Sequence, residues 1–450
     1  MSDKIINFAD LFAGLGGFRE GFETATNELG IKTKCVLTAE IKKAAKEVYK
    51  KRYKQDSVED KDFKDIRELS NKDIKKLEID VLLGGFVCKS FSKSGNRKGF
   101  ECDINGDLFF QILKVLKASN TGVVILENVD NLVIHDKSIS KHKIYKNNEE
   151  IEIGNTFKIV LEELEKLNYE ISWEVLNAKD FGLPQSRNRI FIVAVKKDIE
   201  KNEKFKTVNK KISMKYKKKT KLFKEIKEEA TEEIIKNDFT KKLCEKYDMK
   251  FLEGKKINDK RGKDNNIHSW DFGLFGEVSE AEKKILVEIM ENRRKKIYRD
   301  KYGLSNDGVP LKIEDIEELT NMAKKELKKN INSLLKKGYL KERKIKEHIG
   351  YDIISGRLKY YFNNFIHPEG ITLTLTATDA KKNGVCEKNG VRHLTNGELC
   401  DLFGFNKKLM LPALEGINKN QIFDLFGNSL AVPIVYEITK ELFKKISIDH

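Results

Sequence analysis

Short runs of consecutive apolar residues alternate with amphipathic segments over the first 196 residues. Segments with apolar residues every three or four positions predict helices from Phe18 onward, over 108–116 and over 157–167. Strands that alternate with helices indicate an α/β fold with a doubly wound, mostly parallel sheet. The apolar runs predict the strands of that sheet at 5–10, 35–39, 80–83, 123–126, 172–177 and 190–195.

Glycines and acids stand where the first three strands are expected to end. Gly14 and Gly16 follow the first strand, and a glycine turn lets the backbone approach a ligand closely. Glu40 ends the second strand, a little over twenty residues later, where nucleotide-binding folds place the acid that holds ribose hydroxyls. Asp65 is a third acid in a strand-end position. Together these residues predict a nucleoside site.

A cysteine and an acid follow the next two strands. Gly84 and Gly85 end one strand and lead to Cys88 in a polar loop. Catalytic groups collect at strand ends in open α/β sheets. The alternative is a buried structural thiol, because free cysteines are among the most buried residues. Glu127 ends the following strand, where it is either a functional carboxylate or a helix-capping acid.

The composition changes at Lys196, and the chain is rich in lysine from there to about Lys263. A solvated helical face explains such a segment. Residues 279–345 have the pattern of a separate unit, which begins with a capping box at Ser279 to Glu282.

Within that unit we expect a short helix at 313–319, a turn, a longer helix and then a strand that starts near Leu340. This order is typical of a winged helix-turn-helix, although small helical bundles share the periodicity. The longer helix would be held by the apolar residues Leu327, Ile331, Leu334 and Leu335.

The C-terminal part returns to regular patterns. It predicts helices at 394–403 and 421–426, and a closing amphipathic helix at 432–446 with Pro433 in its first turn. Between the last two helices lie Gly427, Asn428 and Ser429.

Charge and cysteine content narrow the functional class. Lys and Arg number 87 against 71 Asp and Glu, a net charge of +16. This excess favours a polyanionic partner such as nucleic acid, although solvated lysine-rich helices give the same count. The six cysteines form no C-x-x-C pair, so we expect neither a disulfide scaffold nor a metal site. The chain shows no secretion signal and no apolar run of ~20 residues, so we expect a cytoplasmic protein without a membrane partner.

In this order the segments resemble the cytosine-5 DNA methyltransferase family of prokaryotic restriction–modification systems. The resemblance covers roughly residues 5–196 and 370–445. The ordered set is specific, although any single member is not. The similar segments are Phe12 to Gly17, Gly84 to Ser92, Glu127 to Val129, Gln185 to Arg189, Arg392 to Thr395 with Glu398, and Gly427 to Ser429.

Two places depart from the family pattern. Val87 and Lys89 flank Cys88 where the family usually has proline and glutamine, so the fixed φ of proline is lost. Lys89 adds a cation that would lower the pKa of the neighbouring thiol. Asn396 and Gly397 stand where the family usually has Pro-Arg.

The resemblance implies the Rossmann-like fold of S-adenosylmethionine-dependent methyltransferases. It implies a catalytic and cofactor-binding domain at 1–196, a target-recognition region at 197–405 and a segment at 406–450 that returns to the catalytic domain. It assigns catalysis to Cys88, Glu127, Arg187 and Arg189. It assigns S-adenosylmethionine binding to Phe12, Gly14, Gly16, Glu40, Ile41, Asp65, Ile66, Asn428 and Ser429. Expected DNA contacts are Ser90, Arg97, Lys324, Lys325, Lys328, Lys329 and Asn332.

The implied activity is sequence-specific methylation of carbon 5 of a flipped-out cytosine in double-stranded DNA, through a covalent cysteine adduct. We expect a monomer, and a restriction endonuclease acting separately is the implied partner. Two alternatives stay open at this stage. One is methylation of a tRNA cytosine, and the other is a DNA-binding regulator on a catalytically weak scaffold.

Overall fold

The computed structural model describes residues 5–54, 63–86, 108–135, 141–146, 149–202, 204–207, 214, 216–229, 232–262, 264–304, 306, 308–354 and 360–448. Cys88 and its neighbours Val87, Lys89 and Ser90, together with Arg97, lie outside these residues. The chain forms two compact units. The larger unit comprises Met1–Lys227, Ile371–Ala380 and Asn396–His450, and the smaller unit comprises Glu228–Gly370 and Lys381–Thr395.

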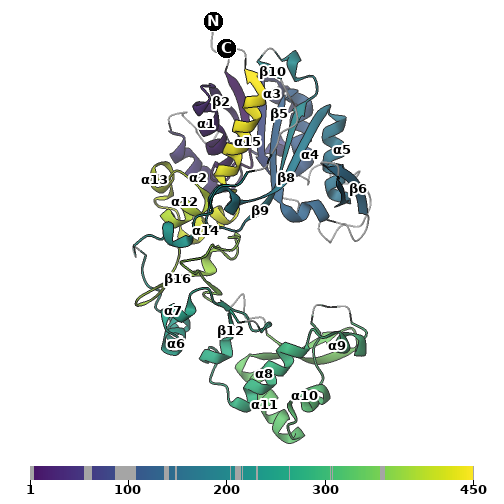
Figure 1. Cartoon of the computed structure of the whole chain (residues 1–450), viewed down its shortest axis with the longest axis vertical. Helices are drawn as coiled ribbons and strands as arrows, with labels where there is room; N and C mark the ends of the chain where they lie inside the picture. The colour runs from purple at the N-terminus through teal and green to yellow at the C-terminus, as the bar shows by residue number, and fades with distance from the viewer. Residues whose placement is uncertain are drawn as a thin grey trace. The chain divides into compact units, whose positions relative to one another are not determined.

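A seven-stranded sheet forms the centre of the larger unit (Figure 1). In spatial order its strands are β3 (Phe63–Lys64), β2 (Thr33–Ala39), β1 (Ile6–Leu11), β4 (Val81–Gly85), β5 (Val123–Val129), β9 (Asn188–Lys196) and β8 (Tyr169–Asn177). The chain starts in the middle with β1 and winds outward both ways. The pairs from β3 to β5 are parallel, and β9 pairs antiparallel with β5 and β8. The predicted mostly parallel α/β sheet is confirmed.

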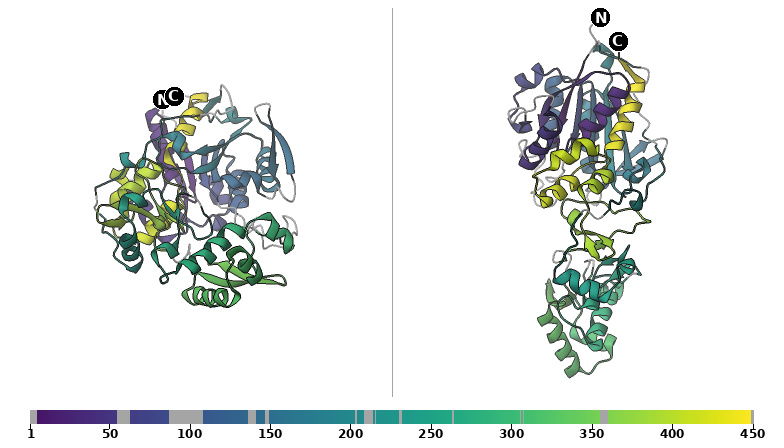
Figure 2. Two further views of the ribbon diagram at one scale, coloured as in Figure 1. Left: turned by 60° about the horizontal axis from the view of Figure 1, so that its bottom comes forward. Right: turned by 90° about the vertical axis from the view of Figure 1, so that its left-hand side faces the viewer.

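Helices cover both faces of this sheet (Figure 2). α1 (Gly17–Glu28) and α15 (Val432–Lys445) pack side by side on one face, although they stand at opposite ends of the chain. α3 (Asn71–Lys76), α4 (Leu108–Ser119) and α5 (Asn155–Lys166) pack on the other face. The remaining helices of the unit are α2 (Lys43–Arg52), α12 (Asn396–Phe403), α13 (Lys407–Leu414) and α14 (Lys419–Gly427).

Side chains alternate in direction along the strands, so each strand contributes apolar residues to the core on both faces of the sheet. In β1, Ile6 and Phe8 pack toward α1 and α15, whereas Ala9 and Leu11 pack toward α4. The strands β4, β5 and β9 alternate in the same way. Because both faces are buried, these strands appear in the sequence as continuous apolar runs.

The larger unit continues beyond the predicted boundary at Lys196. β10 (Phe205–Thr207) pairs antiparallel with β18 (Ile446–Ile448) next to the C-terminus, and this pairing draws the chain back to the unit. A charged hairpin of β6 (Lys141–Lys146) and β7 (Glu149–Gly154) was also not predicted.

The expected solvated helical face in the lysine-rich segment is wrong for residues 216–222, which are not helical. Their backbone and side chains bond to the larger unit instead. The Lys218 N–H donates to the Asp180 carbonyl at 2.7 Å, and the Tyr216 hydroxyl donates to the Glu437 carbonyl at 3.0 Å. These hydrogen bonds attach residues 216–222 to the surface of the larger unit.

Lys419–Lys445 is the one stretch, within the described ranges, that is long and apolar enough to cross a membrane by length and composition. It holds two helices, because α14 ends at Gly427 and α15 begins at Val432. Two thirds of its apolar window is buried inside the protein (67%), which is the behaviour of core helices.

The smaller unit contains two apolar clusters. A five-stranded sheet forms one of them with α6 (Asp238–Lys246) and α7 (Met249–Leu252). The order of its strands is β12 (Asn266–Ile267), β11 (Lys256–Ile257), β15 (Asn364–Phe365), β16 (Asn383–Glu387) and β17 (Gly390–Arg392). The other cluster joins α8 (Glu280–Asn292), α9 (Lys296–Lys301), α10 (Ile313–Thr320), α11 (Lys324–Lys337) and a hairpin of β13 (Leu340–Ile345) and β14 (His348–Ile353).

The start of this second cluster is as predicted. Ser279 and Glu282 form the expected capping box of α8, with the Glu282 N–H donating to the Ser279 hydroxyl at 3.3 Å. A three-residue turn that starts at Asn321 separates α10 from α11. Leu311 pairs with Tyr351 of β14 as a third, single-residue strand beside the hairpin.

Asp352 ties the helices of this cluster to the hairpin. Its carboxylate is fully buried and accepts from Arg293, at the end of α8, at 2.8 Å and from Arg343 of β13 at 2.9 Å. A buried carboxylate needs such partners, because an unpaired buried charge strongly destabilises a fold.

Candidate active site

The carboxyl ends of the parallel strands bring the predicted site residues to one edge of the larger unit. Asp65 follows β3, Glu40 follows β2 and Phe12 follows β1. Gly85 ends β4, and Glu127 lies near the end of β5. Along the sheet, the cofactor candidates therefore occupy one half of the edge. Glu127 of β5 and the end of β4, the strand that precedes Cys88 in the sequence, occupy the other half.

Two adjoining cavities open at this edge. The larger, of about 330 Å³, is lined by the glycine turn and by Glu127, Asn428 and Ser429. The smaller, of about 160 Å³, lies against Asp65 and Ile66. Four residues line both cavities and mark where they join: Phe12, Glu40, Ile41 and Leu108.

Glu40 is fixed by three backbone N–H groups. One carboxylate oxygen accepts from Gly14 at 2.9 Å, and the other accepts from Ile41 at 2.7 Å and from Lys42 at 2.8 Å. The carboxylate thus connects the glycine turn to the start of α2. A carboxylate has about four lone-pair sites, so Glu40 retains acceptor capacity toward the cavity.

The glycine turn uses a backbone conformation that side chains disfavour. Phe12 has a φ of 58°, and Gly14 and Gly16 have φ values of 52° and 75°. A bulky residue in this region is strained, and such strain clusters at ligand-binding sites. Ile41 is 64% exposed, so an apolar side chain stands uncovered where the cavities join.

Asp65 lies against the smaller cavity but also caps its own turn. It accepts from the backbone N–H of Arg67 at 3.0 Å and from the Arg67 guanidinium at 2.9 Å. The hydrogen bonds from Arg67 lower the pKa of Asp65, so its carboxylate is ionised at neutral pH.

Glu127 and Arg189 form an ion pair at the other half of the edge. Nε of Arg189 lies 2.9 Å from Oε1 of Glu127. The antiparallel pairing of β9 with β5 sets this contact, because it places Arg189 opposite Val129, two residues from Glu127. Burial raises the pKa of Glu127, while the charges of Arg189 and Arg187 oppose the rise.

Asn128 anchors the end of β4, which precedes Cys88 in the sequence. Its side-chain amide donates to the Phe86 carbonyl at 2.7 Å. A Cβ on Gly85 would lie 3.2 Å from a Glu127 carboxylate oxygen, so glycine allows the close approach of the two strands.

Arg187 reaches away from this pair and joins three parts of the chain. It donates to the carbonyls of Leu375 at 2.6 Å and Gly427 at 3.1 Å, and also to that of Ser429. Burial, together with the charge of Arg189, lowers the pKa of Arg187 to about 9, so the guanidinium is still charged at neutral pH.

The sequence interpretation missed the segment 371–380, which contains Leu375. It runs beside residues 184–186, where the Ser186 N–H donates to the Thr372 carbonyl at 2.8 Å and the Thr374 hydroxyl donates to the Ser186 carbonyl at 2.7 Å. Its run of threonines, Thr372, Thr374, Thr376 and Thr378, is the only sequence signal that marks it.

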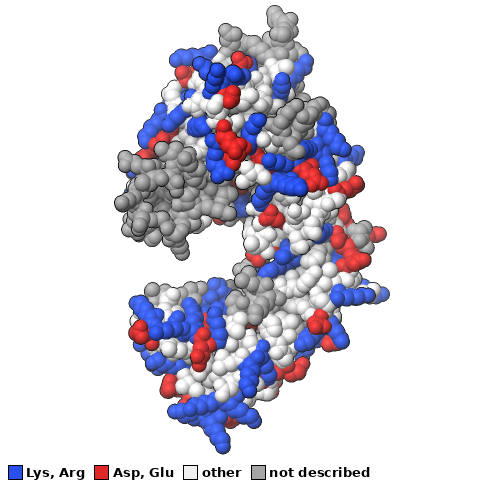
Figure 3. Space-filling view, turned by 180° about the vertical axis from the view of Figure 1, so that it is seen from behind, with Lys and Arg blue, Asp and Glu red and all other residues white. Residues whose placement is uncertain are grey.

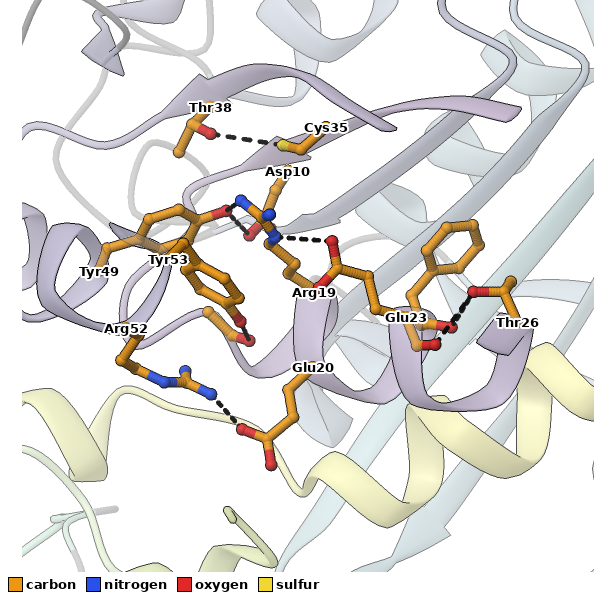
Figure 4. Close-up of polar contacts among 12 residues, drawn as sticks. Asp10, Arg19, Glu20, Glu23, Thr26, Cys35, Thr38, Tyr49, Arg52 and Tyr53 are labelled. Atoms are coloured by element: carbon orange, nitrogen blue, oxygen red, sulfur yellow. Dashed lines mark hydrogen bonds and ion pairs between the residues drawn. The ribbon is translucent and has the colours of Figure 1, made fainter. Parts of the chain in front are cut away.

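A layer of polar residues supports the glycine turn from the side of α2 (Figure 4). Arg52 donates to the Leu15 carbonyl and pairs with Glu20 of α1. The Tyr53 hydroxyl donates to the Gly16 carbonyl at 3.3 Å. The Arg19 guanidinium lies over the Tyr53 ring, 3.8 Å from its centre.

Asp10 lies within this layer, at the end of β1. It is fully buried and accepts from the Tyr49 hydroxyl at 3.1 Å. Its second oxygen has no hydrogen-bond partner among the described residues. Burial raises the pKa of Asp10 to about 7.

The predicted DNA contacts of α11 belong to the smaller unit. Lys324, Lys325, Lys328, Lys329 and Asn332 are all exposed on one side of α11, and Leu327, Ile331 and Leu334 are buried on the other. Lys and Arg side chains are scattered over the surface of the smaller unit among uncharged and acidic residues (Figure 3). Within the described ranges, no group of three or more His, Cys, Asp or Glu could hold a metal ion.

A family model described as C-5 cytosine-specific DNA methylase matches residues 6–444. The chain belongs to this family. It is thus a DNA cytosine-5 methyltransferase, and its methyl donor is S-adenosylmethionine.

Relatives of known name match this methyltransferase over nearly its whole length. Type II methyltransferase M.NlaIV of Neisseria lactamica is 37% identical, and the match covers 97% of this chain and 98% of the relative. M.NgoBV of Neisseria gonorrhoeae is 38% identical over the same shares. M.BanI of Aneurinibacillus aneurinilyticus is 35% identical over 98% of this chain and 96% of the relative.

Solved structures support the fold. The Entamoeba histolytica methyltransferase EhMeth superposes with a TM-score of 0.52 at 14% identity, and 98% of each chain is covered. The S. pombe Dnmt2 methyltransferase gives a TM-score of 0.50 at 15% identity, again over 98% of each chain.

The titration of Asp10 allows a test, by the pH dependence of stability, of the polar layer that supports the glycine turn. The folded-state pKa of about 7 lies above the ordinary value of 3.8, so the folded protein keeps a proton that the unfolded chain loses. The contribution of protonated Asp10 to the free energy of unfolding is fully present below pH about 4, and it is lost as the pH rises to about 7. We expect Asp10→Asn, which mimics the protonated form, to gain up to about 4 kcal/mol over the parent protein across this range.

Urea unfolding would measure this difference in a Trp270→Phe background. The remaining tryptophan, Trp173 of β8, then reports on the larger unit alone. A difference between the Asp10→Asn and parent proteins that stays constant from pH 4 to pH 8 would contradict the shifted titration.

Proposed function

We propose that this methyltransferase modifies a cytosine within a specific sequence of duplex DNA and protects that DNA in a restriction–modification system. The full-length relatives are named Type II methyltransferases, and their similarity includes the smaller unit. The observation that carries the proposal is the Glu127–Arg189 pair beside a nucleoside-sized cavity, at the edge where β4, the strand that precedes Cys88 in the sequence, ends. The enzyme would act as a cytoplasmic monomer, with a restriction endonuclease acting separately.

The chemistry calls for a nucleophile because carbon 5 of cytosine is itself weakly nucleophilic. The Cys88 thiolate adds to carbon 6 of the ring, and electron density then moves to carbon 5. After the methyl group is on carbon 5, the proton of that carbon leaves and the thiolate departs, which restores the aromatic ring. Lys89 would favour the thiolate through its charge.

Glu127 and Arg189 would stabilise the ring as charge develops. Burial raises the pKa of Glu127. Its carboxyl group would hold ring N3 and the exocyclic amine of the cytosine. Arg189 would contact O2 of the ring. Arg187 would act indirectly, since its hydrogen bonds hold the segments at Leu375, Gly427 and Ser429.

The two joined cavities fit S-adenosylmethionine, which supplies an electrophilic methyl group on a sulfonium sulfur. Glu40 would accept from the ribose hydroxyls, and Asp65 with Ile66 would hold the adenine in the smaller cavity. The exposed Ile41 and the Phe12 ring would pack against the nucleoside. The turn at Gly14 and Gly16 gives the backbone close access, and Asn428 and Ser429 would hold the methionine end in the larger cavity.

A cytosine inside a duplex must leave the base stack to reach this site, at a cost of a few kcal/mol. Contacts from the target-recognition region, 197–405, and from Ser90 and Arg97 would offset that cost. The core of this region is the smaller unit. Its helices α8, α10 and α11, the bridge at Leu311 and the β13–β14 hairpin have the order of a winged helix-turn-helix. We infer that α11 contacts DNA, where lysines bind phosphates and Asn332 can read a base.

Trapping on DNA tests the catalytic assignment. A duplex with 5-fluorocytosine at the target cannot lose a proton from carbon 5, so the covalent adduct persists. We expect an adduct of enzyme and DNA that survives denaturing electrophoresis, requires S-adenosylmethionine and is absent with Cys88→Ser. An adduct that forms equally with Cys88→Ser would overturn the role of Cys88.

The same assay separates the two alternatives. Trapping on a 5-fluorocytosine tRNA and not on duplex DNA would favour the RNA substrate. Binding of S-adenosylmethionine and DNA with no adduct on either substrate would favour the catalytically weak regulator, whose support is Val87 and the Asn396-Gly397 departure.

Salt titration tests the role of α11. We expect Lys328→Ala combined with Lys329→Ala to weaken DNA binding and to flatten the slope of log affinity against log salt by up to about 1.8, the contribution of two phosphate contacts. The matched control is Lys241→Ala with Lys246→Ala, which removes two exposed lysines from α6 of the same unit. A slope unchanged in the α11 variant, or changed equally in the control, would remove α11 from the interface.

A further inference from the structure

The two ends of α2 both hold the glycine turn. Just before the helix begins, the carboxylate of Glu40 accepts from the N–H of Lys42 and also from the N–H of Gly14 in the turn. At the last residue of the helix, Arg52 donates to the carbonyl of Leu15. One helix therefore fixes the turn through an N–H group and through a carbonyl.

The Arg52 side chain also joins the turn to two other helices. It is only 1% exposed, and its guanidinium pairs with the Glu20 carboxylate of α1 as well as with the Leu15 carbonyl (Figure 4). The second oxygen of Glu20 accepts from the Asn406 N–H at 2.6 Å, directly before α13. A planar guanidinium donates along fixed directions, so Arg52 sets the turn, α1 and α13 in one geometry.

The side chains around Arg52 pack directly on the turn. A Cβ added to Gly16 would lie 3.0 Å from the Tyr53 hydroxyl oxygen and 3.1 Å from Nη1 of Arg52. A Cβ added to Gly17 would lie 3.3 Å from the Phe405 ring. These close approaches leave the turn little room to relax on the side of α2.

The conformation of the turn depends on such support. Phe12 has a φ of 58°, which is disfavoured for a bulky residue and persists only where the surroundings hold it. Phe12 and Gly14 line the larger cavity, whereas Arg52 is not among the described residues that line either cavity. Arg52 can therefore act on a ligand in the cavity only through the turn.

We propose that Arg52 is a positioning residue for the methyl-transfer reaction, which holds the glycine turn in the conformation that binds S-adenosylmethionine. Without its contacts to Leu15 and Glu20, the turn would populate other conformations, and only a fraction of the protein would be competent to bind. The apparent affinity falls in proportion to that fraction. This inference rests on the proposed position of S-adenosylmethionine in the cavity.

The affinity for S-adenosylhomocysteine, the product that remains after methyl transfer, tests this role. Arg52→Met is combined with Glu20→Gln, because Glu20 alone would be a buried carboxylate without its partner. In calorimetric titrations of the full-length protein we expect about tenfold weaker binding, which corresponds to a competent fraction of about one tenth. An affinity within about twofold of that of the parent protein would overturn the proposal.

Binding kinetics distinguish a positioning role from a contact with the ligand. A smaller competent fraction lowers the association rate constant, whereas the loss of a ligand contact raises the dissociation rate constant. In surface plasmon resonance with immobilised protein, we expect the association rate constant of S-adenosylhomocysteine to fall about tenfold and its dissociation rate constant to stay within about twofold. A loss of affinity caused by faster dissociation would overturn the proposal.

Arg52→Lys provides a second test if the double variant does not fold. Lysine keeps a positive charge near Glu20 but replaces the planar fork with a single ammonium group. We expect S-adenosylhomocysteine to bind at least about threefold more weakly, again through slower association. Binding equal to that of the parent protein would contradict the positioning role.

Lys204→Met combined with Asp80→Asn is the matched control. Nζ of Lys204 lies 2.7 Å from the Asp80 carboxylate, which is 6% exposed, and Asp80 directly precedes β4 at the end of the strand away from the cavities. We expect unchanged affinity for S-adenosylhomocysteine. A loss equal to that of the Arg52 variant would show a general effect of stability and overturn the proposal. Failure of the parent protein to bind S-adenosylhomocysteine would instead contradict the cofactor assignment under the proposed function.

Discussion

The parallel pairing of β1 with β2 and β4 is the constraint on which this site depends. Parallel neighbours must be joined by crossovers, so each strand ends at the same edge of the sheet. The hydrogen bond from the Gly14 N–H to Glu40 exists only because β1 and β2 end together. The same rule brings the end of β4 beside Glu127 of β5. Cofactor and catalytic candidates thus become neighbours although about one hundred residues separate them in the sequence.

Arg187 extends this arrangement to parts of the chain that the sheet does not contain. Its guanidinium is buried and bonds to backbone carbonyls of the segments at Leu375 and at Gly427 to Ser429. A buried charge requires such partners, so these two segments are fixed at the edge of the sheet. The packing of α15 against α1 supports the same return of the C-terminus.

The sequence predicted the sheet and most of its helices because apolar runs and strand-end glycines are local signals. It also predicted that Phe12, Glu40 and Asp65 directly follow strands, and their role in cofactor binding stays a prediction. It did not predict the segment 371–380 or the extended course of residues 216–222. Each of these depends on hydrogen bonds or charges between residues far apart in the chain. Cys88 lies outside the described residues, so its place in the site stays a prediction.

The boundaries of the two units also depend on contacts between residues far apart in the chain. The change in composition at Lys196 is real, but the larger unit continues to Lys227 because β10 pairs with β18 at the far end of the chain. Composition reports what a segment is made of, whereas the boundary is set by what it pairs with.

Bisulfite sequencing of mixed-sequence duplex DNA, after incubation with the protein and S-adenosylmethionine, tests the central claim most directly. The account predicts that cytosines in one sequence context become protected, and that protection is lost without S-adenosylmethionine. Protection spread over all contexts would contradict sequence-specific recognition. A complete lack of protection by protein that binds S-adenosylmethionine would contradict the DNA methyltransferase activity itself.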